Sequence, residues 1–60
     1  MQLTLKGKTV RGKNRIRRGG DTWTVIDSQE SNFMLVESVS NPRELFWMHK
    51  LNDPNIEVVK

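Results

Sequence analysis

A chain of 60 residues without a single cysteine has to stabilise its fold by packing apolar side chains, because it can form neither disulfides nor thiolate metal sites. A domain of this size buries only about 60% of the surface that its unfolded chain exposes. The length therefore predicts one domain, residues 1–60, with little room for a deep active-site cavity. His49 cannot form a zinc site without carboxylates, and we expect no metal and no other cofactor.

Short runs of β-branched and aromatic residues, separated by turn residues, recur along the chain. We find no window that combines apolar side chains at helical spacing with matching caps, which predicts an all-β fold. The expected strands are Leu3–Val10 with a continuation at Lys13–Arg18 after a bend at Gly12, Thr22–Ile26, Phe33–Val39, Leu45–Lys50 and Ile56–Val59.

Glycine, proline and short polar residues mark the turns between these strands. The expected turns are Gly19-Gly20-Asp21, the polar loop Asp27–Asn32 and Asn41-Pro42. Leu51–Asn55 predicts a short 3₁₀ turn before the last strand.

The long first arm, the Gly-Asp turn into Thr22-Trp23-Thr24-Val25, the hairpin, the Leu51–Asn55 turn and the final strand together resemble a known fold family. This layout is similar to small five-stranded SH3-like β-barrels, which include KOW, Tudor and small archaeal chromatin-type domains. The resemblance implies a binding domain for nucleic acid or for protein, and fold alone does not choose between them. The length and the residue pattern of the chain also resemble those of small accessory proteins of tailed bacteriophages. This resemblance implies an origin more than an activity.

The charge is distributed unevenly. Residues 1–20 carry seven lysines and arginines and no acid, whereas residues 21–60 carry three basic and seven acidic side chains, for a charge of −4. Such an asymmetry favours an anionic partner. An alternative is that the first segment forms a solvated edge strand or neutralises the acids of the same domain.

The basic N-terminal arm, residues 6–18, is the candidate nucleic-acid contact. In an extended chain, alternate cations of this arm share one face, and Val10 and Ile16 point to the core. The candidate residues are Lys8, Arg11, Lys13, Arg15, Arg17 and Arg18. Contacts to phosphates alone predict low sequence specificity.

Phe46, Trp47 and Met48 place apolar side chains on both faces of one strand, so one of these faces can be exposed. An exposed aromatic residue there would stack on a base or form the centre of a protein contact. We expect one of Trp23 and Trp47 to anchor the core. His49 has no serine, cysteine or paired carboxylate at a spacing typical of catalysis, and the chain has no predicted catalytic residue.

The leading hypothesis is a non-enzymatic module that binds DNA or RNA. The alternative is a phage-type interaction module that binds an acidic host protein acting on nucleic acid, and inhibits or redirects it. A structural component of a virion that forms a small oligomer is a third possibility, and a dimer is compatible with so short a chain. The sequence contains neither a membrane-spanning run nor a signal-peptide core, so we expect the cytoplasm, which is the host cytoplasm if a phage encodes the chain.

Overall fold

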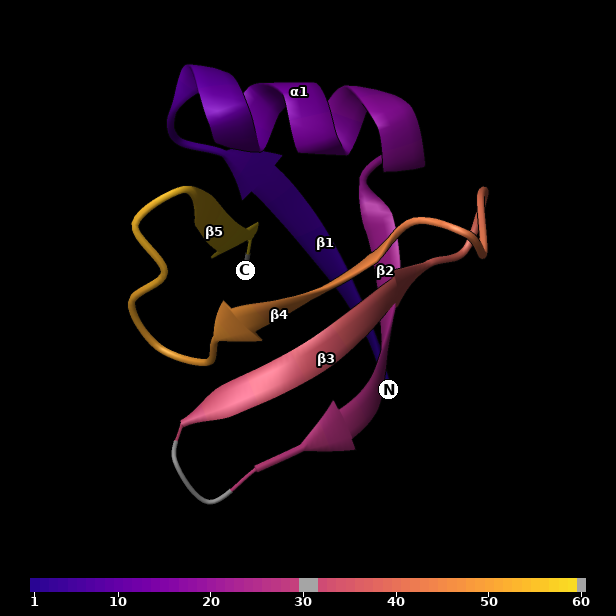
Figure 1. The fold of residues 1–60 in the computed structure, drawn as a ribbon, viewed down its shortest axis with the longest axis vertical. Helices are drawn as coiled ribbons and strands as arrows, with labels where there is room; N and C mark the ends of the chain where they lie inside the picture. Colours follow the sequence, from indigo (N-terminus) through magenta and orange to yellow (C-terminus); the bar gives the residue numbers. More distant parts are fainter. Residues whose placement is uncertain (30–31, 60) are drawn as a thin grey trace.

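The computed structural model describes residues 1–29 and 32–59, which form five strands and one helix (Figure 1). The strands are β1 (Gln2–Gly7), β2 (Thr22–Ser28), β3 (Phe33–Ser38), β4 (Leu45–His49) and β5 (Ile56–Val59). They form one antiparallel sheet in the order β4-β3-β2-β1-β5. The prediction of an all-β fold is confirmed in part: the domain is mostly β with a five-stranded sheet, but it also contains one short helix.

Strand bounds agree with the sequence pattern to within about two residues after Gly20. In β3 the expected alternation places Met34, Val36 and Ser38 on the buried face. A bulge between Val25 and Asp27 lets β2 continue to Ser28, into the predicted loop. Two residues of that loop, 30 and 31, lie outside the described residues.

The sheet is curved but not closed, because its edge strands β4 and β5 do not pair within the described part of the chain. A complete barrel is therefore not shown. The 3₁₀ turn predicted in Leu51–Asn55 is not found either, and this segment is an irregular loop. Asp53 organises the loop, since its carboxylate accepts bonds from the backbone N–H groups of His49, Asn55 and Ile56 at 2.9–3.1 Å.

Residues 10–19 form the helix α1 (Val10–Gly19), and the prediction of an extended arm there was wrong. Thr9 caps the helix, because its backbone is extended and its hydroxyl oxygen accepts a bond from the N–H of Gly12 at 3.1 Å. Gly20 ends the helix with a φ of 80°, which favours glycine, and its N–H donates to the Ile16 carbonyl. The cations Arg17 and Arg18 in the last turn interact favourably with the helix dipole.

Helix α1 contacts the sheet mainly through glycine. A Cβ atom on Gly12 would lie 2.0 Å from the Asn55 carbonyl oxygen, and one on Gly19 would lie 2.5 Å from the Trp23 ring. Gly7 of β1 faces the backbone of Gly12 and Lys13 just as closely. The buried face of α1 therefore lacks the large apolar side chains that sequence periodicity detects.

The core lies on the concave face of the sheet, partly beneath α1. It contains the buried side chains of Leu5, Trp23, Met34, Val36, Met48 and Ile56. Trp23 is fully buried at its centre, in edge-to-face contact with Phe46 at a centroid distance of 5.2 Å. The indole N–H of Trp23 donates to the Gly20 carbonyl at 2.9 Å, which ties the core to the end of the helix.

Candidate nucleic-acid interface

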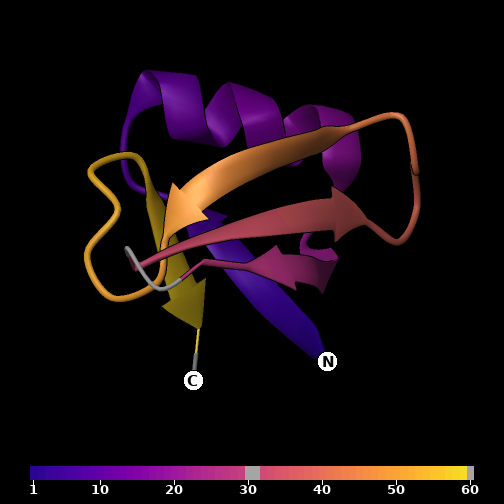
Figure 2. The same ribbon diagram turned by 60° about the horizontal axis from the view of Figure 1, so that its bottom comes forward.

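Helix α1 carries five cations and no acid in ten residues. In both ribbon views the helix forms the outer boundary of the molecule, and the side of α1 that faces away from the sheet is free of other elements (Figures 1 and 2). The sheet covers Gly12 and Gly19, so the cations distribute over the two flanks and the outward face. The helix thus gathers on one element the candidates Arg11, Lys13, Arg15, Arg17 and Arg18.

Arg11, Arg15 and Arg18 follow the spacing i, i+4, i+7 and form the flank of α1 that faces β4. The Arg15 guanidinium lies 4.3 Å from the centroid of the Phe46 ring, a cation–π contact. The Nε of Arg18 lies 3.4 Å from Oε1 of Glu44, in the segment before β4. Two of the three arginines on this flank are therefore engaged within the domain, and Arg11 is exposed.

Lys13 lies on the opposite flank and Arg17 lies on the outward face beside Val10, and both are exposed. Like Arg11, they form no ion pair with any residue in the described ranges. Val10 and Asn14 lie between the two flanks and point away from the sheet, and Val10 is 76% exposed. The side chain of Asn14 makes no hydrogen bond within residues 1–29 and 32–59.

Lys8 precedes the helix, and its hydrogen bonds stabilise the fold. Its ammonium donates to the Asp53 carbonyl at 2.9 Å, and its backbone N–H donates to the Asn55 carbonyl at 2.8 Å. The hydroxyl of Thr9 donates to Oδ1 of Asn55 at 2.9 Å. These bonds attach the N-terminal end of α1 to the loop between β4 and β5, and the bond from the Trp23 indole to the Gly20 carbonyl holds the other end.

A separate aromatic surface lies on the convex face of the sheet. Trp47 is 44% exposed and Phe33 is 43% exposed, and Leu35 lies directly across from Trp47 in the register of β3 and β4. Phe33 makes an edge-to-face contact with His49, at a centroid distance of 5.5 Å. Of the predicted triplet only Trp47 belongs to this surface.

The two other members of the triplet point to the concave face, because side chains alternate along β4. Met48 is buried in the core, and Phe46 is half-buried beneath Arg15. Acidic residues border the convex face, with Glu37 opposite Thr24 and Asp27 opposite Leu35. This face is therefore much less suited to a polyanion than α1.

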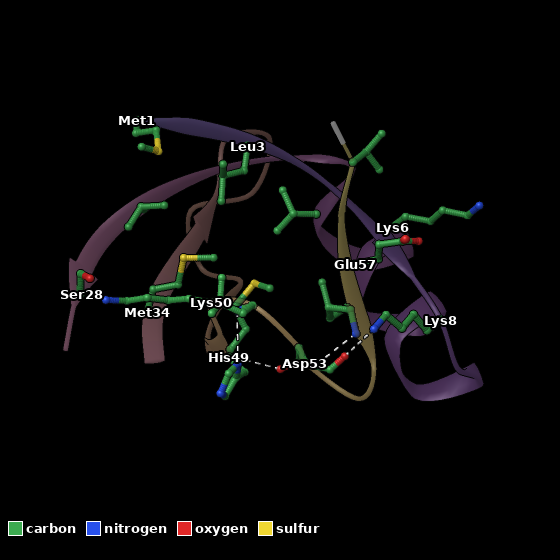
Figure 3. A pocket seen from close by; sticks show the side chains of 16 residues that line it. Met1, Leu3, Lys6, Lys8, Ser28, Met34, His49, Lys50, Asp53 and Glu57 are labelled. Carbon is green, nitrogen blue, oxygen red and sulfur yellow. Dashed lines mark hydrogen bonds between the residues drawn. The ribbon is translucent and has the colours of Figure 1, made fainter. Parts of the chain in front are cut away.

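An open pocket of about 790 Å³ lies on the part of the concave face that α1 leaves uncovered (Figure 3). Its floor is apolar and includes Leu3 and Met34. Three lysines line it. The ammonium groups of two of them donate to backbone carbonyls, Lys8 to Asp53 and Lys50 to Gln29, both at 2.9 Å, and the side chain of Lys6 points away from the pocket at its rim (Figure 3). The ammonium groups of Lys8 and Lys50 therefore support the loops around the pocket.

His49 also has a structural role. Its Nδ1 accepts bonds from the backbone N–H groups of Leu51 and Asn52 at 3.2 and 3.0 Å. Within residues 1–29 and 32–59 there is no group of three metal-ligating side chains. No helix in these ranges is long and apolar enough to cross a membrane.

Five of the six predicted cations lie on α1, and the sixth, Lys8, supports the fold. The sequence analysis did not select Val10, Asn14 or Phe33, and its prediction that Val10 points to the core was wrong, since Val10 is 76% exposed. A helix assignment would have found the first two, since i, i+4 spacing places them on one face. Comparisons with protein-family models, curated proteins and solved structures found no match.

Proposed function

We propose that this protein is a non-enzymatic module that binds nucleic acid through helix α1. The observation that carries this proposal is that Arg11, Lys13 and Arg17 are exposed on one helix and have no acidic partner among the described residues. A helix of like charges without internal neutralisation attracts a polyanion, and binding releases the counterions of the phosphates. Contacts made by these cations alone position the protein and carry no sequence information.

The distribution of acids supports the same assignment. Glu37 and Asp27 lie along the convex face of the sheet, and Glu44 pairs with Arg18 at one end of the helix. Because α1 itself contains no acid, its exposed side is cationic, whereas the convex face of the sheet carries Glu37 and Asp27. We place the protein in the cytoplasm, where nucleic acid is accessible, and in the host cytoplasm if a phage encodes it.

We also propose that the fold is related to the SH3-like barrels. Five antiparallel strands surround one core, and a short loop joins the edge strands β4 and β5. If the fold is compared with such a barrel, α1 lies in the connection between β1 and β2. The relation is compatible with the proposed binding role but does not determine it.

The test is a salt titration of binding, with labelled duplex and single-stranded oligonucleotides and fluorescence anisotropy as the measurement. If about four phosphates are neutralised, affinity falls about 100-fold between about 50 and 200 mM salt. Lys13→Gln should lower affinity and reduce the slope of log K against log salt by about one. Absence of binding to any oligonucleotide at low salt would refute the proposal.

Lys6→Gln is the matched control for this titration. Lys6 is an exposed cation like Lys13, but it lies on β1, opposite Glu57 in the register with β5. Both substitutions remove one positive charge, so a general effect of net charge would change both slopes equally. A specific role of α1 requires that Lys6→Gln leave the slope nearly unchanged.

The exposed aromatic surface favours a second candidate function, a protein-interaction module. Phe33 and Trp47 form an apolar centre, which is typical of protein contacts. The partner would be a protein that acts on nucleic acid and presents acidic side chains to α1. A pull-down with nuclease treatment separates the two functions, since a stoichiometric partner that survives nuclease and is lost with Trp47→Ala supports the second.

A further inference from the structure

We propose that α1 is a recognition helix that enters the major groove of duplex DNA and contacts base edges with Val10, Asn14 and Arg17. This inference rests on the proposed function and adds a substrate class and a means of sequence discrimination. It replaces the expectation of low specificity with a short preferred sequence.

The first argument is the chemistry of the outward row. Val10, Asn14 and Arg17 are spaced i, i+4, i+7 and lie on the side of α1 opposite the buried glycines. Each belongs to a type that contacts base edges: an amide pairs with adenine, a guanidinium pairs with guanine, and an apolar group packs against the thymine methyl. Val10 is largely exposed and Asn14 has no hydrogen-bond partner in the described ranges, so neither has an evident role in the fold.

The second argument is the position of the flanking cations. Arg11 and Lys13 lie on opposite sides of the outward row. A helix that lies in a groove has a phosphate backbone on each side, and cations on both flanks match this arrangement. A helix that lay along a single strand would need its cations on one flank only.

The third argument is shape. The major groove of B-DNA admits one α-helix, and α1 is exposed along its whole length at the boundary of the molecule (Figures 1 and 2). Ten residues give a length of about 15 Å, which corresponds to about four or five base pairs. The glycine contacts and the bonds to Asn55 fix the helix on the sheet, so it does not have to order on binding.

Other nucleic acids fit this surface less well. The major groove of duplex RNA is too deep and narrow for side chains to reach the bases. Single strands are bound by aromatic stacking next to a cationic groove, but Phe33 and Trp47 lie on the convex face, beside Asp27 and Glu37. Duplex DNA is therefore the substrate class that both the charge and the shape of α1 favour.

The test starts with selection from a pool of randomised duplex DNA by the full chain. We expect enrichment of a contiguous site of about four or five base pairs. Replacement of guanine by 7-deazaguanine within that site should weaken binding about tenfold, because it removes the N7 acceptor from the major groove. The minor groove is unchanged by this replacement.

Two variants separate base contacts from phosphate contacts. Asn14→Ala should lower affinity for the selected duplex about tenfold, with little change for unrelated duplexes and an unchanged salt slope. Lys13→Gln should weaken binding to all duplexes alike and reduce the slope by about one. Asn14 is exposed in a helix and alanine favours helix, so the variant should fold, as far-UV circular dichroism would verify.

Each failure has a separate meaning. Binding to duplex DNA without an enriched site, or without loss of discrimination in Asn14→Ala, overturns the recognition helix and leaves the proposed function standing. Tighter binding to single strands or to duplex RNA overturns the substrate class. No binding to any nucleic acid at low salt overturns both proposals.

Discussion

Replacing Gly12 by alanine tests how α1 is attached to the sheet, because local propensity and packing predict effects of opposite sign. In an isolated helix, alanine is more favourable than glycine by about 1 kcal/mol. In this fold the added Cβ would lie 2.0 Å from the Asn55 carbonyl oxygen, whereas ordinary contacts begin at 3.4 Å. The helix and the loop would have to separate by about 1.4 Å to accept it.

That separation breaks contacts that fix the start of α1. The Lys8 N–H bond to the Asn55 carbonyl is 2.8 Å long, and the Thr9 hydroxyl bond to the Asn55 side chain is 2.9 Å long. Each such bond stabilises a protein by about 1 kcal/mol, and overpacking adds about 1–3 kcal/mol. After the gain in helix propensity, we expect a net loss of about 2–4 kcal/mol, which lowers the Tm by at least about 8 °C in a domain of this size.

Urea unfolding followed by the fluorescence of buried Trp23 is the appropriate assay. Asn14→Ala is the matched control, since it also introduces alanine into α1 but at an exposed position. The control should equal or exceed the stability of the original protein. If Gly12→Ala is as stable as this control, the close contact between α1 and the loop does not exist.

Further substitutions probe the core, the loop and the charge of α1. Trp23→Ala should lower the free energy of unfolding by about 3–5 kcal/mol and Trp47→Ala by much less, since only Trp23 is fully buried; urea unfolding measures both. Ser38→Ala should cost about 1–3 kcal/mol in the same assay, because the buried hydroxyl donates to the Gly19 carbonyl and accepts from the Asn41 N–H. Asp53→Ala should cost about 2 kcal/mol through the loss of three backbone bonds to its carboxylate. Arg11→Glu should raise thermal stability slightly, because it places an acid near the helix N-terminus, while anisotropy shows weaker binding to DNA.

The strands could be predicted because they obey the alternation that sheets impose. Met34, Val36 and Ser38 point inward in β3, and the Ile56–Val59 strand has the predicted bounds. The helix could not be found by the same criterion, because its buried face consists of glycines and a half-buried Ile16. The sequence does contain capping signals for this helix: Thr9 before it, and Gly20 after a last turn with two arginines. A search for apolar periodicity does not take such signals into account.

Five of the six candidate cations lie together on one element, but this element is a helix and not the predicted strand. A strand would have placed alternate cations on one face, whereas the helix distributes them over two flanks and adds Val10 and Asn14 between them. For the aromatic residues, composition predicted that one tryptophan would be buried but not which one. The register of β3 and β4 decides it, since Trp47 pairs with Leu35 on the convex face.

The charge of α1 opposes its own folding, which strengthens the case for an external anion. Two pairs of cations repel each other at the spacing i, i+4: Arg11 with Arg15, and Lys13 with Arg17. The first turn also contains no acid that would interact favourably with the helix dipole. A helix that served only as a solvated surface would be more stable with acids among these cations. The structure holds it instead through glycine packing and caps, and among the described residues only Glu44 forms an ion pair with it. The repulsion among the cations of α1 therefore lowers the stability of the domain. Binding to a polyanion explains why the chain keeps these cations, whereas a purely structural role does not.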